Sequence, residues 1–491
     1  MHREISRPRR PRRDPDAGLR EWLRLLDAVL GAIEAVVWDV REIGEQTWEE
    51  TRGTPRKVKR LAATGWCLTA IATSYRLHVT RSAFVTRGRA ARQLEALHQK
   101  NARRFYELCV GHGGAFLKVG QLLSARADLL PAAWITELSK LQDQVPGVPF
   151  EAVRATLEED LGVELAEVFS SFDEAPIAAA SIGQVHRATT TGGLEVAVKI
   201  RRPDIDELVV HDLDLLEAFI GGVRDQLPPS DWDTIVAEVR AMVMAELDYP
   251  RERATMERLE AFFAEGGFEG IRVPAPVPEL CTERVLVASF EPGVKITDAL
   301  DALHAAGETK RVSTILGRLL EAYVAQVIEA GVFQADPHPG NFLVTEADEL
   351  VVLDFGCAKE LPASVRRTYL GLVQAALLSD RAGVIEHLDA LGFATRSGSH
   401  ETLERFADAM LRDFRDAVAS GAMRFGDGDA MIAQARGLMS ASEHDPVVRV
   451  PDHFVMIGRV FGTLGGLFAH YQPTIDYARH VLPSFTRGVR G

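Results

Sequence analysis

The sequence has few cysteines, few aromatic residues and a shortage of positive charge. Its four cysteines (Cys67, Cys109, Cys281 and Cys357) form no C-x-x-C pair, which argues against a cysteine metal site and fits a reducing, cytoplasmic compartment. Aromatic residues make up 7% of the 491 residues while alanine is abundant, a balance that favours helices. A net charge of −14 argues against a nucleic-acid-binding protein, which needs a basic face.

The chain also lacks a long apolar run. Residues 61–75 would cover only about half to three quarters of a bilayer and include Thr and Ser, so we predict a buried or interfacial helix there. Residues 454–468 are apolar but contain Arg459 and several glycines, and for them we predict a packed helix hairpin. We therefore expect no transmembrane segment.

Positive charge is concentrated at the start of the chain, within residues 1–13. No apolar segment of the secretory type follows it directly. We interpret these arginines as a solvated, disordered tail. The alternative is a peripheral contact with anionic lipid or another acidic surface. The arginines are Arg3, Arg7, Arg9, Arg10, Arg12 and Arg13.

The first third of the chain has a helical pattern. Residues 16–110 mix charged and apolar residues at helical spacing, beginning with an apolar stripe at Trp22, and residues 111–114 interrupt them. A further helix carries Lys118 and Gln121. Pro146 and Pro149 then mark a boundary before a short helix at about 150–160.

The middle of the chain has the pattern of a small sheet. Residues 180–185 and 195–200 predict a β-hairpin, and a strand is expected at 285–290. A long helix is expected at 232–264, and another at 308–330 that ends at Gly331. Two short strands (342–344 and 350–353) and a mostly helical remainder follow.

This order predicts an α+β fold with two lobes and a helical N-terminal extension. We divide the chain into four parts. They are an extension over 1–95, a helical segment over 96–170, a small lobe over 171–292 and a helical lobe over 293–491.

Three oxygen-bearing side chains stand out near the second pair of strands. Asp336 and Asn341 bound the rigid loop Asp-Pro-His-Pro-Gly-Asn, and Asp354 opens Asp-Phe-Gly at the end of the strand at 350–353. Asp and Asn are also common turn residues, but the ordered combination is specific. Hard oxygen ligands, few from protein and the rest from phosphate and water, suit Mg²⁺.

Lys199 lies on a strand in Val-Ala-Val-Lys, the setting in which kinases hold ATP phosphates with a lysine paired to a helix glutamate. Both flanks are apolar, so an unpaired buried charge would be costly. The long helix offers Glu246, Asp248 and Glu252 as partners. Upstream, residues 178–185 match the spacing of a glycine-rich phosphate loop, with alanine in its first two glycine positions. The methyl groups limit the approach to phosphate, so we expect altered nucleotide handling.

Together these residues resemble the UbiB (AarF/ADCK) family of atypical kinases. The resemblance covers residues 95–480 and depends on four motifs. They are Lys-Val-Gly-Gln at 118–121, Ala-Ala-Ala-Ser-Ile-Gly-Gln-Val at 178–185, Glu-Leu-Asp-Tyr at 246–249, and the Asp336 loop with Asp354-Phe-Gly.

The resemblance implies a kinase-like fold, ATP and Mg²⁺ as cofactors, and a role for each matching residue. Lys199, Glu252 and Asp336 would be catalytic, and Asn341 and Asp354 would bind metal. The helical segment would pack over the active site through the regulatory residues Lys118, Gln121, Glu246 and Asp248. The nucleotide would contact Lys199 and Ala178, Ala179, Ala180, Ser181, Gly183, Val185 and Phe290.

Two departures from ordinary kinases matter. Pro250 lies between Asp248 and Glu252, so the long helix is expected to kink or split, which puts the Lys199–Glu252 pair in question. No Ala-Pro-Glu motif follows Gly356, so the apparatus that docks peptide substrates is missing.

Three functions are compatible with the sequence. The first, which the resemblance implies, is an ATP-dependent atypical kinase or ATPase that supports isoprenoid quinone (ubiquinone-type) biosynthesis or membrane-lipid handling, with a lipid or quinone precursor as ligand. The second is true phosphoryl transfer to a small molecule or protein. The third is a non-catalytic scaffold gated by nucleotide, although a scaffold would not need Asp336.

Overall fold

The structure is a computed structural model of the chain. It describes residues 55–82, 84–124, 130–143, 147–179, 182–223, 232–405, 407–408, 415, 420–424 and 447–490. The chain divides into two compact units. Unit 1 contains residues up to 153 with 178–184 and 201–247, and unit 2 contains 154–177, 185–200 and 248 onward. The basic start and the apolar stripe at Trp22 lie outside the described residues.

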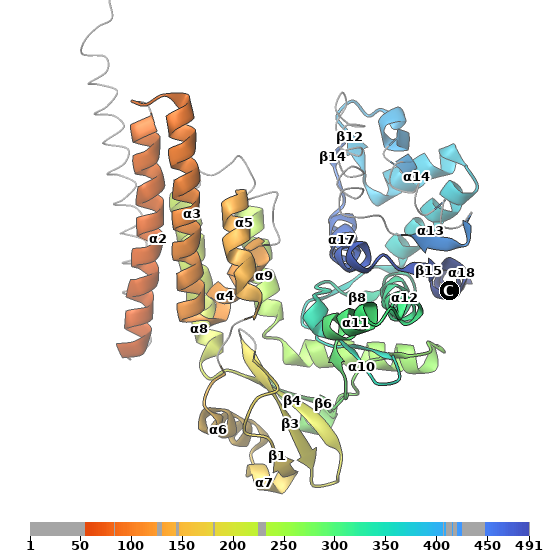
Figure 1. Cartoon of the computed structure of the whole chain (residues 1–491), viewed down its shortest axis with the longest axis horizontal. Coiled ribbons are helices and arrows are strands. Elements are labelled where there is room, and N and C mark those ends of the chain that lie inside the picture. Colours follow the sequence, from red (N-terminus) through yellow and green to blue (C-terminus); the bar gives the residue numbers. More distant parts are fainter. Residues whose placement is uncertain are drawn as a thin grey trace, which may run out of the picture. The chain divides into compact units, whose positions relative to one another are not determined.

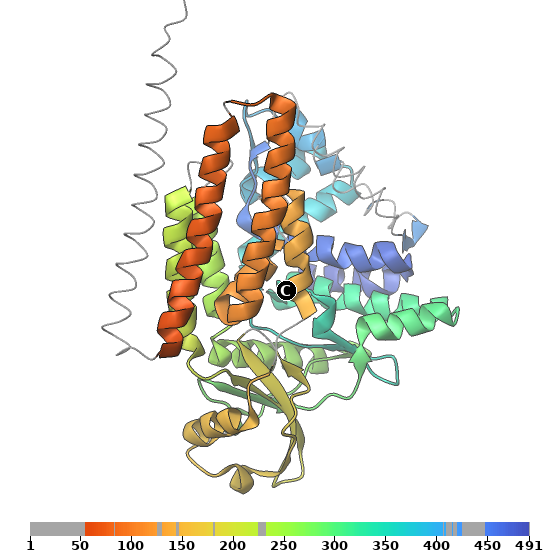
Figure 2. The same ribbon diagram turned by 60° about the vertical axis from the view of Figure 1, so that its left-hand side comes forward.

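Unit 1 is built mainly from helices. Its two longest described helices, α2 (Pro55–Ser82) and α3 (Arg87–His112), lie side by side (Figures 1 and 2). The break predicted at 111–114 is confirmed, because the next helix begins at Gly114. The other elements are α4 (Gly114–Ser124), α5 (Ala132–Leu138), η1 (Ser139–Asp143), β2 (Ala178–Ala179), α8 (Ile205–Val223) and α9 (Trp232–Ala245).

Apolar side chains from these helices form the core of unit 1. Phe105 of α3, Phe116 of α4 and Val209 of α8 are among its buried members. At Gly120 of α4, a Cβ atom would come within 2.4 Å of the Leu141 side chain. A larger residue in place of the glycine of the Lys-Val-Gly-Gln motif would therefore force the buried Leu141 side chain to move.

The first sheet of unit 2 confirms the predicted hairpin. Its strand order is β1-β3-β4-β6, with β3 and β4 adjacent. Alternate residues of β4 face the core, where Val196, Val198 and Ile200 are fully buried. Lys199 therefore lies on the opposite face, as the period of two requires. The strands are β1 (Phe169–Phe172), β3 (Gly183–Thr190), β4 (Glu195–Arg201) and β6 (Val285–Ser289).

The largest core of unit 2 lies around α12 (Thr309–Ala325), where most of the helix is buried. The helix continues into the π-helical turn η4 (Gln326–Ala330) and ends at Gly331, whose φ of 66° is left-handed. The predicted helix end at Gly331 is confirmed. The strand β8 (Val332–Gln334) follows directly and leads into the Asp336 loop.

A second sheet holds the loop and the Asp-Phe-Gly segment together. Its order is β5-β10-β9-β7, with β9 and β10 antiparallel, as predicted for 342–344 and 350–353. A separate pair joins β8 to β11. These strands are β5 (Ile271–Arg272), β7 (Val294–Lys295), β9 (Phe342–Val344), β10 (Leu350–Val352) and β11 (Ala358–Glu360).

The remaining elements are mostly helical, as expected, with short strand pairs among them. They are α6 (Phe150–Leu161), α7 (Leu165–Val168), α10 (Tyr249–Glu265), η3 (Pro278–Leu280), α11 (Ile296–Ala305), η5 (Pro339–Asn341), α13 (Ala363–Leu377), α14 (Arg381–Leu391), β12 (Ala394–Thr395), β13 (Ala422–Arg424), β14 (Val447–Arg449), α17 (Asp452–Tyr471), β15 (Thr474–Asp476), α18 (Tyr477–His480) and α19 (Leu482–Arg490).

The single long helix predicted at 232–264 is wrong, and the split that Pro250 suggested is present. The chain forms α9 and α10 instead, separated at 246–248. Asp248 is the N-cap of α10, and its side chain accepts a hydrogen bond from the Arg251 amide at 3.0 Å. Pro250 lies in the first turn, where proline removes no helical hydrogen bond.

We expect Asp248→Ala to lower the free energy of unfolding by about 1 kcal/mol, because it removes the cap of α10. Urea unfolding of the full chain measures this. Glu260→Ala on the same helix is the matched control and should change stability little. Equal stability of the two variants would contradict the capping role.

The helix hairpin predicted at 454–468 is also wrong. These residues form part of one continuous 20-residue helix, α17, whose buried side includes Val460, Leu464 and Phe468. Glycine lowers helix propensity by only about 1 kcal/mol, and burial of this face outweighs that cost. Within the described part of the chain, every helix, including α2, is too short or too polar to cross a membrane.

Candidate functional site

Lys199 and Glu252 form a close ion pair in unit 2. The Lys199 Nζ atom lies 2.7 and 2.8 Å from the two carboxylate oxygens of Glu252, and 3.5 Å from Oδ1 of Asp354. The Glu252 side chain is 2% exposed and that of Lys199 is 22% exposed. The break before α10 therefore does not prevent the pairing, because Glu252 lies in the first turn of a newly capped helix.

Burial and neighbouring charges shift the pKa values of Lys199 and Glu252 in opposite directions. Burial raises the pKa of Glu252 to about 7, although the Lys199 ammonium opposes the change. For Lys199, burial alone would lower the pKa, but the carboxylates of Asp354 and Glu252 outweigh it and raise that pKa well above its usual value. Lys199 is therefore a permanent positive charge next to Asp354.

The predicted loop from Asp336 to Asn341 is held by its own backbone. The amides of His338 and Asn341 donate to the carbonyls of Asp336 and His338 at 2.8 and 2.9 Å. The side-chain amide of Asn341 donates to the Asp336 carbonyl at 3.1 Å. This contact uses the nitrogen of Asn341 and leaves its Oδ1 atom as the acceptor for a ligand.

Asp354 has a left-handed backbone, with φ of 57°. This conformation costs a non-glycine residue about 1–2 kcal/mol and is most tolerable for Asp and Asn. The Asp354 carboxylate accepts the Gly356 amide at 3.3 Å, and the side chain is 49% exposed. The next residue, Phe355, donates its backbone amide to the Glu252 carboxylate at 3.3 Å. A hydrogen bond therefore connects the Asp-Phe-Gly segment to the Lys199–Glu252 ion pair.

The donor set fits Mg²⁺. Asn341 offers a carboxamide oxygen, and Asp354 offers a partly exposed carboxylate beside Lys199. Mg²⁺ takes hard oxygen ligands and retains water or phosphate in its remaining positions, so two protein ligands suffice. No group of three or more His, Cys, Asp or Glu residues able to hold a metal occurs in the described ranges.

Little in the sequence indicated a cluster of three buried polar side chains that contacts the Asp354 segment. Tyr323, Gln326 and Gln334 are at most 1% exposed, and the Tyr323 hydroxyl donates to Oε1 of Gln334. Burial, reinforced by the charges of Asp336 and Asp354, raises the pKa of Tyr323 well above its usual value, so the hydroxyl keeps its proton. The only sequence signal was a glutamine on a strand that is otherwise apolar.

The expected nucleotide loop is described only in part. Ala180 and Ser181 lie outside the described residues, and Ala178, Ala179 and Gly183 belong to unit 1. In unit 2, Val185 accepts the Ile177 amide at 2.8 Å, and the Phe290 amide donates to Glu195 at 3.0 Å. The Arg187 guanidinium lies 4.5 Å from the centre of the Phe290 ring. The nucleotide contacts of these residues stay predictions.

The four residues predicted to be regulatory take part in three separate contacts. Within unit 1, Lys118 of α4 forms an ion pair with Glu246, and both side chains are 13% exposed. Gln121 donates to the Leu141 carbonyl at 3.0 Å. Asp248 instead caps α10 in unit 2. Lys118 and Glu246 of the predicted set thus contact each other, while the regulatory role of the set stays a prediction.

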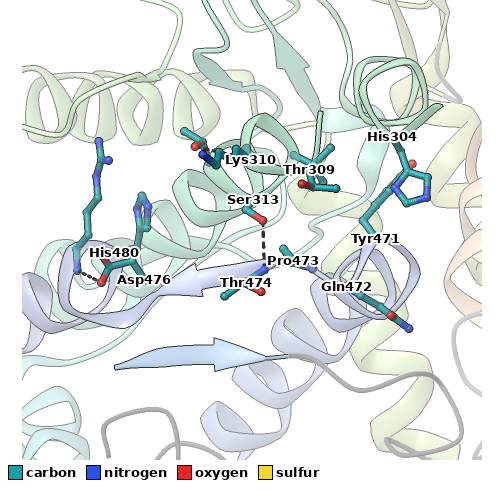
Figure 3. Close-up of a pocket in the computed structure, with 13 residues that line it drawn as sticks. His304, Thr309, Lys310, Ser313, Tyr471, Gln472, Pro473, Thr474, Asp476 and His480 are labelled. Atoms are coloured by element: carbon teal, nitrogen blue, oxygen red, sulfur yellow. Dashed lines mark hydrogen bonds between the residues drawn. The ribbon is translucent and has the colours of Figure 1, made fainter. Parts of the chain in front are cut away.

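A cavity of about 610 Å³ in unit 2 contains none of the predicted site residues (Figure 3). It lies between the start of α12 and the segment from Tyr471 to His480. The Thr474 amide donates to Ser313 at 3.2 Å, and His480 contacts Glu321 at 2.9 Å. Its lining is held by internal contacts that do not involve Asp336, Asn341 or Asp354.

A solved structure supports the predicted α+β fold. The structure of the Rv3197–erythromycin complex from Mycobacterium tuberculosis is similar, with a TM-score of 0.56 and 23% sequence identity. The similarity covers 80% of this chain and 98% of that one. At this identity the likeness establishes the fold alone.

Sequence relatives indicate the family. An uncharacterized Synechocystis protein, sll1770, is 31% identical over 394 residues, covering 79% of this chain and 65% of that protein. The Arabidopsis thaliana chloroplastic protein ACTIVITY OF BC1 COMPLEX KINASE 7 is 32% identical, covering 76% and 52%. AarF domain-containing protein kinase 1 of Xenopus tropicalis is 34% identical, covering 60% and 57%.

The chain thus spans between about half and two thirds of the length of these relatives. The family model described as "ABC1 atypical kinase-like domain" matches residues 140–388, about half of the chain. The resemblance to the AarF/ADCK group drawn from the motifs is thereby confirmed. The chain belongs to the ABC1 atypical kinase-like family, which includes the AarF domain-containing kinases.

Proposed function

We propose that the chain binds ATP with Mg²⁺ and acts as an atypical kinase or ATPase. The observation that carries this proposal is the buried Lys199–Glu252 pair beside Asp354, in the same unit as Asp336 and Asn341. Lys199 would hold phosphate oxygens, and Asn341 and Asp354 would hold the metal. Bound Mg²⁺ would neutralise charge on the phosphates.

Asp336 has the role of orienting the attacking hydroxyl or water in this proposal. Its side chain is partly buried, and the residue lies two positions after Gln334, the last residue of β8, so the strand anchors the backbone next to it. The names of the relatives support the kinase-like class. A role in isoprenoid quinone biosynthesis or membrane-lipid handling, with a lipid or quinone precursor as ligand, rests on the family resemblance.

The first experiment measures steady-state ATP hydrolysis by the full chain, with and without vesicles of anionic lipid. We expect Mg²⁺-dependent turnover that falls strongly in Asp336→Asn while ATP binding persists. Stimulation by vesicles supports the lipid-related role. Wild-type turnover no higher than that of Asp336→Asn would refute the catalytic assignment.

Phosphoryl transfer to a small molecule is the second candidate. The chain between Gly356 and α13 is short and includes β11, so it offers no long segment on which a peptide could dock. A stable phosphorylated small molecule formed from labelled ATP in cell extract favours this candidate. Tight ATP binding without turnover under either condition favours the nucleotide-gated scaffold instead.

A further inference from the structure

The side chain of Gln334 contacts the backbone of the candidate metal-binding segment. This last residue of β8 is 1% exposed, and its Nε2 atom donates to the carbonyls of Leu353 and Asp354 at 2.8 and 2.6 Å. Because carbonyl oxygens only accept, the NH₂ group must face them. Oε1 then faces the Tyr323 hydroxyl, which donates to it. All the polar atoms of this side chain are therefore used.

The backbone conformation at Asp354 explains how one side-chain amide contacts two successive carbonyls. In an extended strand they point to opposite sides, whereas here the chain turns at Asp354 with φ of 57°. The amide of Gln334 therefore matches the left-handed conformation of Asp354. If Asp354 relaxed to an extended conformation, one of the two hydrogen bonds would be lost.

Gln334 also belongs to the segment that carries Asp336. Its backbone amide donates to Oε1 of Gln326 at 3.0 Å, and the next amide, of Ala335, donates to the Cys357 carbonyl at 3.3 Å. One residue thus connects the two loops whose side chains approach substrate and metal. Tyr323 and Gln326 come from α12 and the π-helical turn, so the support is part of the core.

We propose that Gln334, oriented by Tyr323, is a positioning residue that holds Asp354 in its metal-binding conformation and so determines Mg²⁺ affinity. This inference rests on the proposed function, because it assigns Asp354 to the metal. Gln334 itself touches neither metal nor nucleotide. Loss of the Gln334 side chain should therefore weaken Mg²⁺ binding more than it weakens nucleotide binding in the absence of Mg²⁺.

The test is Gln334→Leu, which keeps the size of the side chain and removes its donors and acceptor. Mg²⁺ binding is measured by calorimetry in the presence of a non-hydrolysable ATP analogue. We expect affinity to fall by about 10- to 100-fold, the usual effect of losing a group that orients a metal ligand. Affinity for the analogue without Mg²⁺ should stay within about twofold, and amide hydrogens of residues 353–356 should exchange faster.

Phe333→Leu is the matched control. Phe333 is the preceding residue of β8, is 1% exposed and packs in the apolar core, so its truncation weakens the fold without touching Asp354. It should lower thermal stability and leave Mg²⁺ affinity unchanged. Equal Mg²⁺ affinities for Gln334→Leu and wild type, or equal losses in both variants, would overturn the inference.

Tyr323→Phe provides a second, milder variant if Gln334→Leu fails to fold. It removes one donor and should weaken Mg²⁺ binding by about fivefold, the effect of one hydrogen bond. Unchanged affinity in this variant would overturn the role of Tyr323. Failure of the proposed function has a different signature, because the wild-type chain would then bind no Mg²⁺ with the analogue.

Discussion

Asp354→Asn is expected to lower Mg²⁺-dependent ATP turnover by at least about 100-fold. The change removes one charged ligand, and a metal ion contributes several kcal/mol to stabilising transition-state charge, so a loss of about 3 kcal/mol corresponds to two powers of ten. Asparagine tolerates the left-handed backbone of this position nearly as well as aspartate. The free energy of unfolding should therefore change little, and the loss should be confined to metal-dependent chemistry.

Asp348→Asn is the matched control for this experiment. Asp348 is also an aspartate with a left-handed backbone, at φ of 60°, and it lies in the neighbouring turn between β9 and β10. Its carboxylate pairs with Arg311 at 2.6 Å on the surface. Turnover by Asp348→Asn should stay near that of wild type. Similar turnover by wild type and Asp354→Asn would refute the metal assignment.

Glu252→Leu is expected to destabilise the chain by about 3 kcal/mol, because it leaves the ammonium of Lys199 largely buried without its closest partner. The double variant Lys199→Met with Glu252→Leu removes both charges and should recover most of that stability. Nucleotide binding should be lost in the double variant, since the lysine proposed to hold the phosphates is removed. Urea unfolding and calorimetric nucleotide titration separate the two effects. If the stability losses of the two single changes simply added in the double variant, direct coupling between Lys199 and Glu252 would be contradicted.

The single variant Lys199→Met should make stability depend on pH above 7. Burial already raises the pKa of Glu252 to about 7, and loss of the nearby ammonium would raise that pKa further. The folded state would then bind one more proton than the unfolded state between pH 4.5 and the raised pKa. Stability therefore falls as pH rises through this interval, by up to about 1.4 kcal/mol per pH unit.

Unfolding midpoints measured between pH 6 and 9 test this expectation. The difference in stability between wild type and Lys199→Met should widen from pH 7 to 9, because Glu252 ionises in the wild type near pH 7. Asp348→Asn again serves as the control, since Arg311 lowers the pKa of the Asp348 carboxyl and this group therefore does not titrate between pH 6 and 9. A difference that stays constant across the range would show that Glu252 is not the titrating group.

Much of the candidate site could be predicted because its residues lie close together in the sequence. The loop from Asp336 to Asn341 is fixed by prolines, a glycine and local hydrogen bonds. Asp354 follows a short strand that pairs with the strand after Asn341. The local spacing was therefore enough to predict that Asn341 and Asp354 lie close together, without knowledge of the fold.

The helix containing Glu252 was only partly predictable. Apolar periodicity continues from α9 into α10, so residues 232–264 matched one helix, although Pro250 suggested a break. The cap by Asp248 at the start of α10 decides where the second helix begins. Likewise, Gly458, Gly462 and Gly466 suggested a break within 454–468, but burial along α17 keeps that segment helical.

The sequence by itself determined the family, the candidate oxygen ligands and the lysine that needs a partner, because each depends on residue type at fixed local spacing. Only the tertiary structure decided that this partner is Glu252, that Lys118 pairs with Glu246, and that Tyr323 and Gln334 support Asp354. These contacts join residues from 11 to 128 positions apart in sequence. They depend on how helices and strands pack, since a buried polar group takes its partner from whatever the fold places within hydrogen-bonding distance.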